Sequence, residues 1–135
     1  MRITHEADYA VRMVYVLIKE DRQITARELS ALTGVTLRFT LKIMGKLSEC
    51  GLVTTKMGAT GGYRLAADPD GISMGKVIEC IDGPFEINHC LSGDYDCTRV
   101  SDKSMCPFHR AFSRINKELR DKLYEMKIVD FIEKT

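Results

Sequence analysis

The chain has 135 residues, of which 44% are hydrophobic and 29% charged, a composition typical of a globular protein. This length allows one domain, or a small domain with an oligomerisation arm. No apolar run approaches the roughly 18–20 residues that span a bilayer, and the first residues lack the apolar stretch of a secretory signal. We therefore expect a cytoplasmic protein that does not associate with membranes.

The net charge of +1 conceals a difference between the two halves. Residues 1–67 contain 10 Lys or Arg and 6 Asp or Glu, a net charge of +4, whereas residues 68–135 contain 10 and 13, a net charge of −3. The basic residues between positions 38 and 64 are Arg38, Lys42, Lys46, Lys56 and Arg64, against one acid, Glu49. A basic half suits DNA, because neutralising phosphates releases condensed counterions; a solvated basic face is the alternative.

The first two predicted elements are helices. Thr4 can cap a helix over residues 5–19, where apolar residues recur at helical spacing. Thr25 and Glu28 match a capping box, in which each side chain satisfies a free backbone N–H of the first turn. The short helix that they open should end near Gly34, since glycine permits the turn.

A third helix and a hairpin follow. Thr36 caps a helix that Gly51 ends, so two helices are joined by a short glycine-containing turn, which predicts a helix-turn-helix. Residues 52–56 and 63–65 are strand-like, and the glycine-rich residues 57–62 between them are turn material. A hairpin directly after the third helix predicts the wing of a winged helix-turn-helix.

The second half is expected to hold a short helix, an irregular loop and a long helix. The turn at residues 68–71 marks the boundary of the DNA-binding part, and Ser73 begins a helix that ends near residue 82. Residues 85–106 show no sustained period, and a helix runs from Pro107 to about Lys127. The expected fold is therefore mainly α with a small β-hairpin: a winged helix-turn-helix over residues 1–67, and a sensor loop (85–106) with a dimerisation helix within residues 68–135.

An apolar stripe runs along the long C-terminal helix. Its members are Phe108, Phe112, Ile115, Leu119 and Leu123. So long a helix has more apolar surface than one small winged domain covers, so we expect a homodimer with the last four residues of the stripe at its interface. Packing on the first helix of the same chain is the alternative.

Five cysteines form two groups. An odd number in a reducing compartment makes a disulfide framework unexpected. Cys50 and Cys80 stand in apolar-periodic segments and are expected to be small buried hydrophobic residues. Cys90, Cys97 and Cys106 crowd into one loop, followed by His109 at a Cys-x2-His spacing.

These four residues are predicted to bind a metal centre. Thiolates bind soft transition metals and iron–sulfur clusters, and the start of a helix favours an anionic thiolate. Zinc is the competing metal, since three cysteines and a histidine close a structural tetrahedral site, although the paired Cys-x2-Cys knuckles of such sites are missing. Loop cysteines that are free or paired, and a Cys–His catalytic dyad, are further interpretations; the dyad has no evident pocket or orienting group.

The third helix is expected to enter the major groove and the wing to reach the minor groove. Arg38 is the candidate for a bidentate guanine contact, Lys42, Lys46 and Lys56 for phosphates, and Phe39 is either a DNA contact or a core residue. The full predicted DNA-binding set is Thr36, Arg38, Phe39, Thr40, Lys42, Lys46, Lys56, Thr60, Gly61, Gly62, Tyr63 and Arg64.

Over nearly its whole length the sequence resembles the Rrf-type family of winged-helix regulators, which has IscR-like and NsrR-like members. The motifs that carry the resemblance are Met-Arg-Ile-Thr at the start with Asp8-Tyr-Ala, then Leu47-Ser-Glu-Cys-Gly-Leu-Val, Gly58-Ala-Thr-Gly-Gly-Tyr-Arg-Leu and the three-cysteine loop. The resemblance implies a cytoplasmic homodimer that binds palindromic promoter sites. It also implies a 2Fe–2S or 4Fe–4S cluster that senses redox state, nitric oxide, iron or cluster supply.

The resemblance offers two fourth ligands: His109, at the IscR-like spacing, or Asp8, where NsrR-like members supply a carboxylate from the partner subunit. Some members lack the cysteines and sense through a protein partner. This chain departs from the IscR-like pattern in three ways. Its intervals between cysteines are longer, and Thr40 stands where the family often has an apolar residue. Leu41 stands where IscR-like members have a glutamate that discriminates bases. The operator sequence therefore does not follow from the resemblance.

The sequence thus predicts a switch and not an enzyme: a repressor-type regulator whose DNA binding is modulated by an iron–sulfur cluster. Coupling of this kind is typically worth about 1–3 kcal/mol. Two other hypotheses remain open, namely a metal-free regulator that signals through a protein partner and a zinc-stabilised DNA-binding module.

Overall fold

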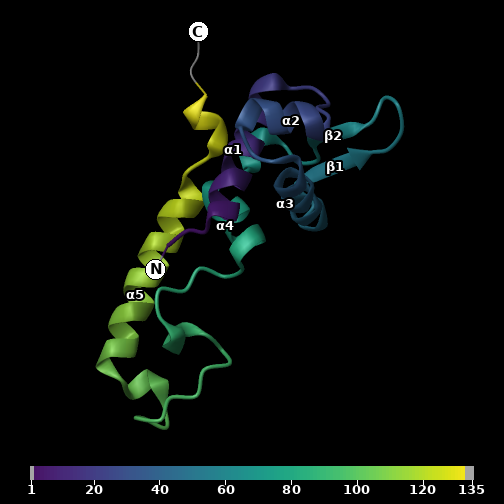
Figure 1. The fold of residues 1–135 in the computed structure, drawn as a ribbon. Coiled ribbons are helices and arrows are strands. Elements are labelled where there is room, and N and C mark those ends of the chain that lie inside the picture. Colours follow the sequence, from purple (N-terminus) through teal and green to yellow (C-terminus); the bar gives the residue numbers. More distant parts are fainter. Residues whose placement is uncertain (1, 133–135) are drawn as a thin grey trace.

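The fold is mainly helical with one small sheet, as expected from the sequence (Figure 1). The computed structural model describes residues 2–132; Met1 and residues 133–135, which the expected domains include, lie outside this range. The helices and strands are α1 (His5–Glu20), α2 (Ala26–Thr33), α3 (Leu37–Glu49), β1 (Val53–Lys56), β2 (Gly62–Leu65), α4 (Met74–Asp82) and α5 (Pro107–Glu125). Short 3-10 turns lie at Pro69–Gly71, His89–Leu91, Lys103–Met105 and Ile128–Phe131.

Side-chain caps fix where the first four helices begin. The hydroxyls of Thr4, Thr25, Thr36 and Ser73 each accept a hydrogen bond from the backbone N–H three residues later. Each bond satisfies a donor that the helix itself leaves free. Gly34, at φ 74°, ends α2 in the left-handed conformation. The predicted helix-turn-helix is therefore confirmed, with the turn at residues 34–36.

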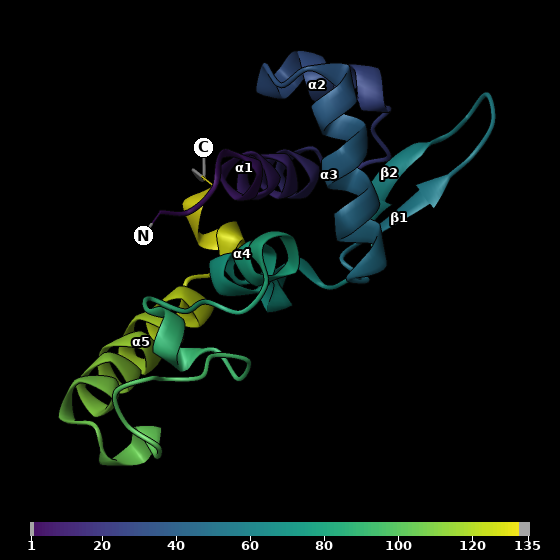
Figure 2. The ribbon, with the colours of Figure 1, turned by 60° about the horizontal axis from the view of Figure 1, so that its bottom comes forward.

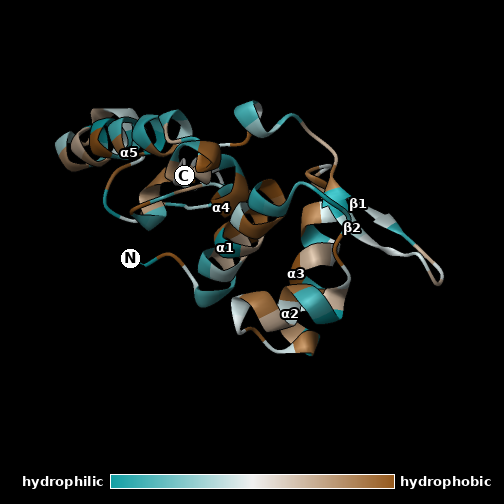
Figure 3. Cartoon of the chain, turned by 90° about the horizontal axis from the view of Figure 1, so that it is seen from above, coloured by the Kyte–Doolittle hydropathy of each residue, from teal (hydrophilic) through white to brown (hydrophobic). Residues whose placement is uncertain are grey.

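One hydrophobic core joins α1 to the other helices of the body. Its members are Ala7, Ala10, Met13, Val14, Leu17, Ile18, Ile24, Leu29, Val35, Ile43, Met44, Leu47, Leu52, Val53, Ile72, Val77, Ile78, Ile81 and Ile128. Apolar segments of α1, α3 and α4 are visible in Figure 3. Residues on both sides of position 67 share this core. The expected division into a DNA-binding part (1–67) and a sensing and dimerisation part (68–135) therefore stays a prediction about function.

The predicted wing is an antiparallel pair of strands that projects from the body (Figure 1). A third segment supports it, because Ile24 and Tyr63 exchange two backbone hydrogen bonds of 2.9 and 2.7 Å. Gly62, at φ 147°, permits this approach, since a Cβ there would meet the Ile24 carbonyl oxygen at 2.7 Å. The loop between α1 and α2 thus fixes the base of the wing.

The long helix α5 packs against α4 and extends away from the body, with the cysteine loop beside it (Figures 1 and 2). Gly75 allows a close approach, because a Cβ there would overlap the ring of Tyr124. The helix ends at Glu125, two residues before the predicted end, and the chain then returns to the body. Ile128 donates to the Ile72 carbonyl at 3.1 Å and is buried in the core.

Glu79 holds α4, α5 and the start of the loop together. Its carboxylate accepts hydrogen bonds from Arg120 at 2.8 Å, from the Phe85 N–H at 2.7 Å and from the Tyr124 hydroxyl. Its side chain is 12% exposed. Burial raises the pKa of Glu79, but the hydrogen bonds from Arg120, Tyr124 and Phe85 outweigh burial and lower it to about 2.

The expectation for Cys50 and Cys80 is wrong. The two residues form a disulfide, with Cα atoms 6.1 Å apart, and Cys50 is exposed while Cys80 is half-buried. They stand in helices that face each other at their C-terminal ends, and the apolar period of each segment alone does not reveal this meeting. Cys90, Cys97 and Cys106 are free.

Glu79→Gln should destabilise the fold by about 2 kcal/mol at pH 7, after discounting for the half-exposed Arg120. The folded-state pKa of about 2 lies below the ordinary 4.5, so the stabilisation is present above about pH 4.5 and is lost as the pH falls towards 2. Urea unfolding at several pH values should therefore show less acid sensitivity in this variant than in the wild type. Glu118→Gln, at an exposed position of α5, is the matched control; an equal acid dependence in wild type and Glu79→Gln would contradict the prediction.

Candidate DNA-binding surface and cysteine cavity

The N-terminal half of α3 presents several of the predicted DNA contacts. Arg38 and Lys42 are exposed, and Thr36, also exposed, caps the helix. Phe39 is 44% exposed, its ring meets Tyr9 edge-on at 6.4 Å between centroids, and Lys42 lies 5.9 Å from the ring. Phe39 thus lies on the surface beside Tyr9 and outside the hydrophobic core, which favours its interpretation as a DNA contact.

Thr40 requires a correction. Its side chain is fully buried, and its hydroxyl donates to the Thr36 carbonyl at 2.9 Å. A side chain in that position faces the core and cannot reach a base edge. The position belongs to the same helical stripe as Ile43, Met44 and Leu47, so the helical period of the sequence contains the signal.

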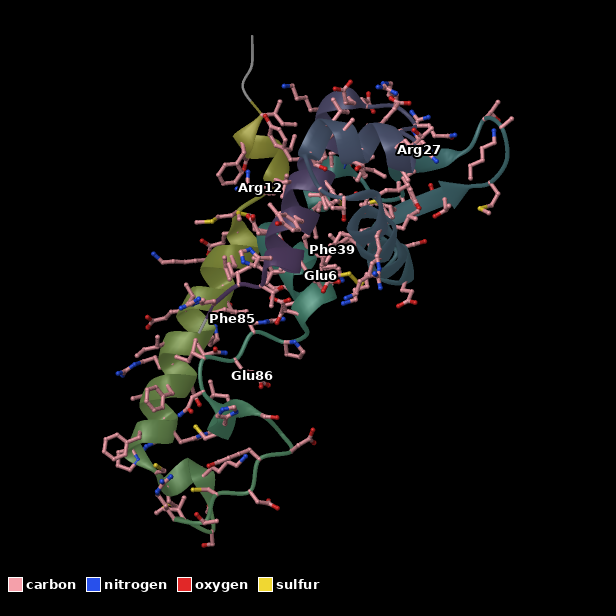
Figure 4. The ribbon with its side chains drawn as sticks, viewed as in Figure 1. Glu6, Arg12, Arg27, Phe39, Phe85 and Glu86 are labelled. Carbon is pink, nitrogen blue, oxygen red and sulfur yellow. A yellow bond between two sulfur atoms is a disulfide. The ribbon has the colours of Figure 1, made fainter. Side chains whose placement is uncertain are left out.

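Glu6 of α1 faces the lysines of α3, a contact that the sequence did not indicate (Figure 4). Its carboxylate lies 2.8 Å from the Lys46 ammonium and 3.6 Å from that of Lys42, and the Glu6 side chain is 18% exposed. The hydrogen bond from Lys46 lowers the pKa of Glu6 against the opposing effect of burial. Two of the three lysines predicted to contact phosphates, Lys42 and Lys46, are therefore partly neutralised within the chain.

The wing tip is exposed and built from its glycines. Lys56, Thr60 and Arg64 are exposed, whereas Gly61, Gly62 and Tyr63 are half-buried. A Cβ at Gly61 would overlap backbone oxygens of the tip, including that of Gly58 at 2.8 Å. The side-chain amide of Gln23 donates to the Thr60 carbonyl, which fastens the tip to the loop before α2.

One cavity gathers the predicted metal ligands. Cys90, Cys97, Cys106 and His109 all line a space of about 240 Å³. Cys106 is the N-cap residue of α5, and His109 lies in the first turn of that helix. His89, Tyr95, Lys103 and Phe112 contribute to the wall. The three cysteines are half-buried, as expected for groups that a ligand would reach from within the fold.

The donors of this cavity suit a thiophilic metal centre. The backbone N–H groups of Arg99 and Val100 point at Cys97 and lower its pKa, which favours the thiolate. His109 has a buried Nδ1 with no hydrogen-bond partner among the described residues. A buried imidazole nitrogen without a partner is costly unless something binds it.

The donors are gathered without being assembled into a coordination sphere. In the described part of the chain, no group of three or more His, Cys, Asp or Glu side chains stands close enough to hold a metal ion. Asp8, the alternative fourth ligand, lines a different cavity with Tyr15 and Phe131 and pairs with Arg12 at 3.2 Å. Asp8 therefore takes part in such a site only if a second copy brings it there.

The base of the cysteine loop is fastened to α5. Asn116 donates through Nδ2 to the Phe85 carbonyl and accepts through Oδ1 from the Ile87 N–H, both at 2.9 Å. Phe85 also donates to Glu79, so one residue of the loop binds α4 and α5 together (Figure 4). The base of the cysteine loop is thereby bonded to both α4 and α5.

The N-terminal part of α5 carries an uncovered apolar face. Phe108 is 73%, Phe112 37% and Ile115 49% exposed, whereas Leu119 and Leu123 are half-buried. Leu123 packs against the core, so the C-terminal part of the predicted stripe is covered within the chain by the body. The main helix contact of α5 is with α4, and not with α1, the first helix, which was the alternative to a dimer interface.

A helix-turn-helix followed by a wing, with basic side chains on its third helix, defines a DNA-binding protein of the winged-helix class. The profile of the Rrf2 family, described as an iron-dependent transcriptional regulator, matches residues 3–134. The chain therefore belongs to the Rrf2 family of transcriptional regulators. The described residues include no helix long and apolar enough to cross a membrane.

Individual relatives agree with this assignment. The chain is 28% identical over 120 residues to an Rrf2-like protein of Rhodobacter capsulatus, covering 84% of this chain and 80% of that protein. It is 32% identical over 99 residues to the HTH-type transcriptional regulator IscR of Vibrio cholerae, covering 72% of this chain and 57% of IscR. The match to IscR thus leaves a large part of that protein unmatched.

Solved structures share the fold. CymR, the global cysteine regulator of B. subtilis, superposes with a TM-score of 0.76 at 19% identity, covering 96% of this chain and 95% of CymR. T. potens IscR superposes with a TM-score of 0.70 at 18% identity, covering 96% of this chain and 85% of IscR. At such low identity these structures support the fold alone, and they confirm the predicted winged helix with a C-terminal helix.

Glu6→Gln should tighten DNA binding by about two- to fivefold, because it removes an anion that neutralises Lys46 and Lys42 and repels phosphate. Lys46→Ala should weaken binding to all sequences alike and reduce the slope of log K against log salt by about one. Fluorescence anisotropy with a mixed-sequence duplex at several salt concentrations measures both effects. Asp121→Asn, which breaks the 2.7 Å ion pair with Lys117 on α5, is the matched control. Unchanged affinity in Glu6→Gln would show that the two lysines do not face phosphates.

Proposed function

We propose that this protein is a homodimeric transcriptional regulator of the cytoplasm, whose binding to palindromic promoter DNA responds to an iron–sulfur cluster held by Cys90, Cys97, Cys106 and His109. The observation that supports this most directly is a single cavity. It gathers three free cysteines and a buried imidazole nitrogen that has no partner in the described chain. Membership of a family described as iron-dependent agrees with it.

DNA reading is assigned to α3 and the wing. Arg38 is the proposed guanine-reading residue, since its guanidinium is exposed in the first turn of α3 and has the fork geometry that matches two acceptors on a base. Thr36, Phe39 and Lys42 flank it, while Lys46 and Lys56 are proposed to contact phosphates. The wing residues Thr60, Gly61, Gly62, Tyr63 and Arg64 are proposed to follow the neighbouring minor groove.

The four donors suit the proposed cluster chemically, and one-electron redox chemistry is what such a group supplies when it is bound. Lys103 donates to the Ser92 carbonyl at 3.0 Å and lies 5.5 Å from the Tyr95 ring, so it braces the loop across the cavity. Phe108 and Phe112 line the cavity from the side of α5. The chain thus supplies ligands, a braced loop and an apolar wall.

A change in the loop has a direct path to the DNA-binding helices. Phe85 at the loop's base binds Glu79, and Glu79 lies on α4, whose buried face packs on α1 and α3. We propose that loop order sets the positions of α4 and α5, and through the dimer the spacing of two copies of α3. A coupling of about 1–3 kcal/mol would change promoter occupancy 5- to 150-fold.

A homodimer is proposed through the exposed apolar face of α5. Phe112 and Ile115 are its centre, and Leu119 and Leu123 continue the stripe towards the body. Two such faces related by a twofold axis would bury each other and would match a palindromic DNA site.

Ile115→Glu combined with Leu119→Glu should convert the dimer to a monomer, because carboxylates in an apolar interface without partners cost several kcal/mol. Size-exclusion chromatography with light scattering measures the mass. Arg114→Glu on the same helix alters charge outside the stripe and should remain dimeric. A folded dimer of the double variant would rule out this seam.

Anaerobically purified wild type should contain iron and acid-labile sulfide and show visible absorption. Cys97→Ser should lose most of the iron, the sulfide and the absorption. His109→Ala should make the cluster labile or shift its absorption, and Asp8→Ala should leave both unchanged, since the two residues line separate cavities. His89→Ala, in the wall of the same cavity, is the matched control.

The same measurement separates the alternatives. An intact spectrum in His109→Ala beside a bleached Asp8→Ala would transfer the ligand role to Asp8 of a second copy. A colourless protein with stoichiometric zinc would identify the zinc-stabilised module. A metal-free protein that still represses would favour signalling through a protein partner.

A further inference from the structure

A second thiol site lies at the C-terminal end of α3, the helix proposed above to read DNA and called the recognition helix below. Cys50 caps α3, Cys80 stands in the last turn of α4, and a disulfide joins them with Cα atoms 6.1 Å apart. This separation lies within the range that allows a disulfide without backbone movement. Neither residue lines the cavity of the other three cysteines. The two thiol sites of the protein are therefore separate.

We propose that Cys50 and Cys80 form a reversible thiol–disulfide site that exchanges with low-molecular-weight anionic disulfides such as glutathione disulfide, and whose oxidised form restrains the recognition helix. The proposal's consequence for DNA affinity rests on the DNA-binding function proposed above. The thiol chemistry itself does not depend on that function or on a metal.

The surroundings of Cys50 suit an anionic disulfide. Cys50 is exposed and lines a cavity of about 400 Å³ that also receives Lys76 and Lys127. Both lysines are exposed, and one carboxylate, Asp70, lies in the same wall. Cys80 is half-buried and does not line this cavity. Access from solution therefore assigns the first exchange to Cys50 and the second to Cys80.

The exchange proceeds in two balanced steps. The Cys50 thiolate attacks one sulfur of the external disulfide, which forms a mixed disulfide on Cys50 and releases one thiol. The Cys80 thiolate then attacks the Cys50 sulfur, which forms the internal disulfide and releases the second thiol. Two electrons and two protons pass from the cysteines to the external disulfide, and excess external thiol reverses both steps.

The bond joins two functional parts of the chain. The Cys80 sulfur lies 3.5 Å from the carbonyl oxygen of Lys46, a residue of the last turn of α3. On the other side, Cys80 follows Glu79, which holds α5 and the cysteine loop. Oxidation thus ties the end of α3 covalently to α4. Reduction leaves that end held by packing and by the Glu6–Lys46 ion pair, so ordering α3 on DNA costs more conformational entropy.

Intact-mass analysis tests the chemistry on the full chain carrying Cys90→Ser, Cys97→Ser and Cys106→Ser, which leaves two thiols. After reduction and addition of glutathione disulfide, this protein should lose two hydrogens and retain no adduct. Adding Cys80→Ser should trap one glutathione on Cys50, and adding Cys50→Ser should abolish or greatly slow adduct formation. Absence of the trapped adduct, or equal reactivity of the two cysteines, would overturn the assignment.

Hydrogen exchange tests the restraint without DNA. Amides of residues 46–52 should exchange at least several-fold more slowly in the oxidised than in the reduced protein, while those of β2 serve as the internal control. Cys50→Ser should match the reduced protein in either buffer, and its circular dichroism should show that it folds. Equal exchange in both redox states would overturn the claim that the bond restrains α3.

A duplex selected from a random-sequence pool by the full chain that keeps Cys90, Cys97 and Cys106, and with them the proposed cluster ligands, tests the consequence for binding. The oxidised protein should bind it at least about fivefold more tightly than the reduced protein, and Cys50→Ser should show no redox dependence. Equal affinities in the two states would overturn the switch. If no duplex is selected while thiol exchange occurs as described, the DNA-binding proposal fails and the thiol site stands.

Discussion

The carboxylate of Glu79 is the interaction on which the arrangement of the other parts depends. It is nearly buried, and it is stabilised by the Arg120 guanidinium, the Tyr124 hydroxyl and the Phe85 N–H. A buried anion is costly when any of its partners is removed, so the three donors are held in place together. Because these donors belong to α5 and to the base of the cysteine loop, one charge on α4 holds two elements that Asn116 also joins to each other.

From α4 the path to the DNA-binding surface is short. Two residues reach the last turns of α3 from different sides: Glu6 of α1 pairs with Lys46, and Cys80 of α4 bonds to Cys50. The recognition helix is therefore held by an ionic contact and by a covalent bond. The ionic contact depends on salt, and the covalent bond depends on thiol redox state. In the proposed mechanism, a loop event transmitted through Glu79 would arrive at α4, the helix that carries Cys80.

The parts of this fold that local chemistry determines were predictable from the sequence. Caps such as Thr25 and Ser73 act within three residues, and the helix-turn-helix, the wing and α5 followed from such signals. The pairings that join distant segments were not predictable, because Glu79 and Arg120 stand 41 residues apart and Cys50 and Cys80 stand 30 apart. For Cys50 the expectation of a reducing compartment argued against a disulfide, and only the meeting of two helix ends brings the sulfurs together. Thr40 differs, since its helical phase places it in the buried stripe of α3, and the prediction of a DNA contact there was wrong although this local signal was present.

The Glu6–Lys46 pair also limits how strongly the chain restrains its own DNA-binding surface. An ion pair with partly exposed members contributes about 0.2–1 kcal/mol, and salt weakens it further. A lysine that reaches phosphate instead gains from counterion release, a gain that is repeated at each phosphate contact of α3 and the wing. In the proposed complex the phosphate therefore wins the competition, and we expect Glu6 to lower affinity without blocking the surface. Its physical effect falls on DNA of any sequence, because an ammonium that exchanges a carboxylate for a phosphate reads no base. In this proposal sequence preference is left to Arg38 and its neighbours, and Glu6 acts on the weaker, non-specific part of binding.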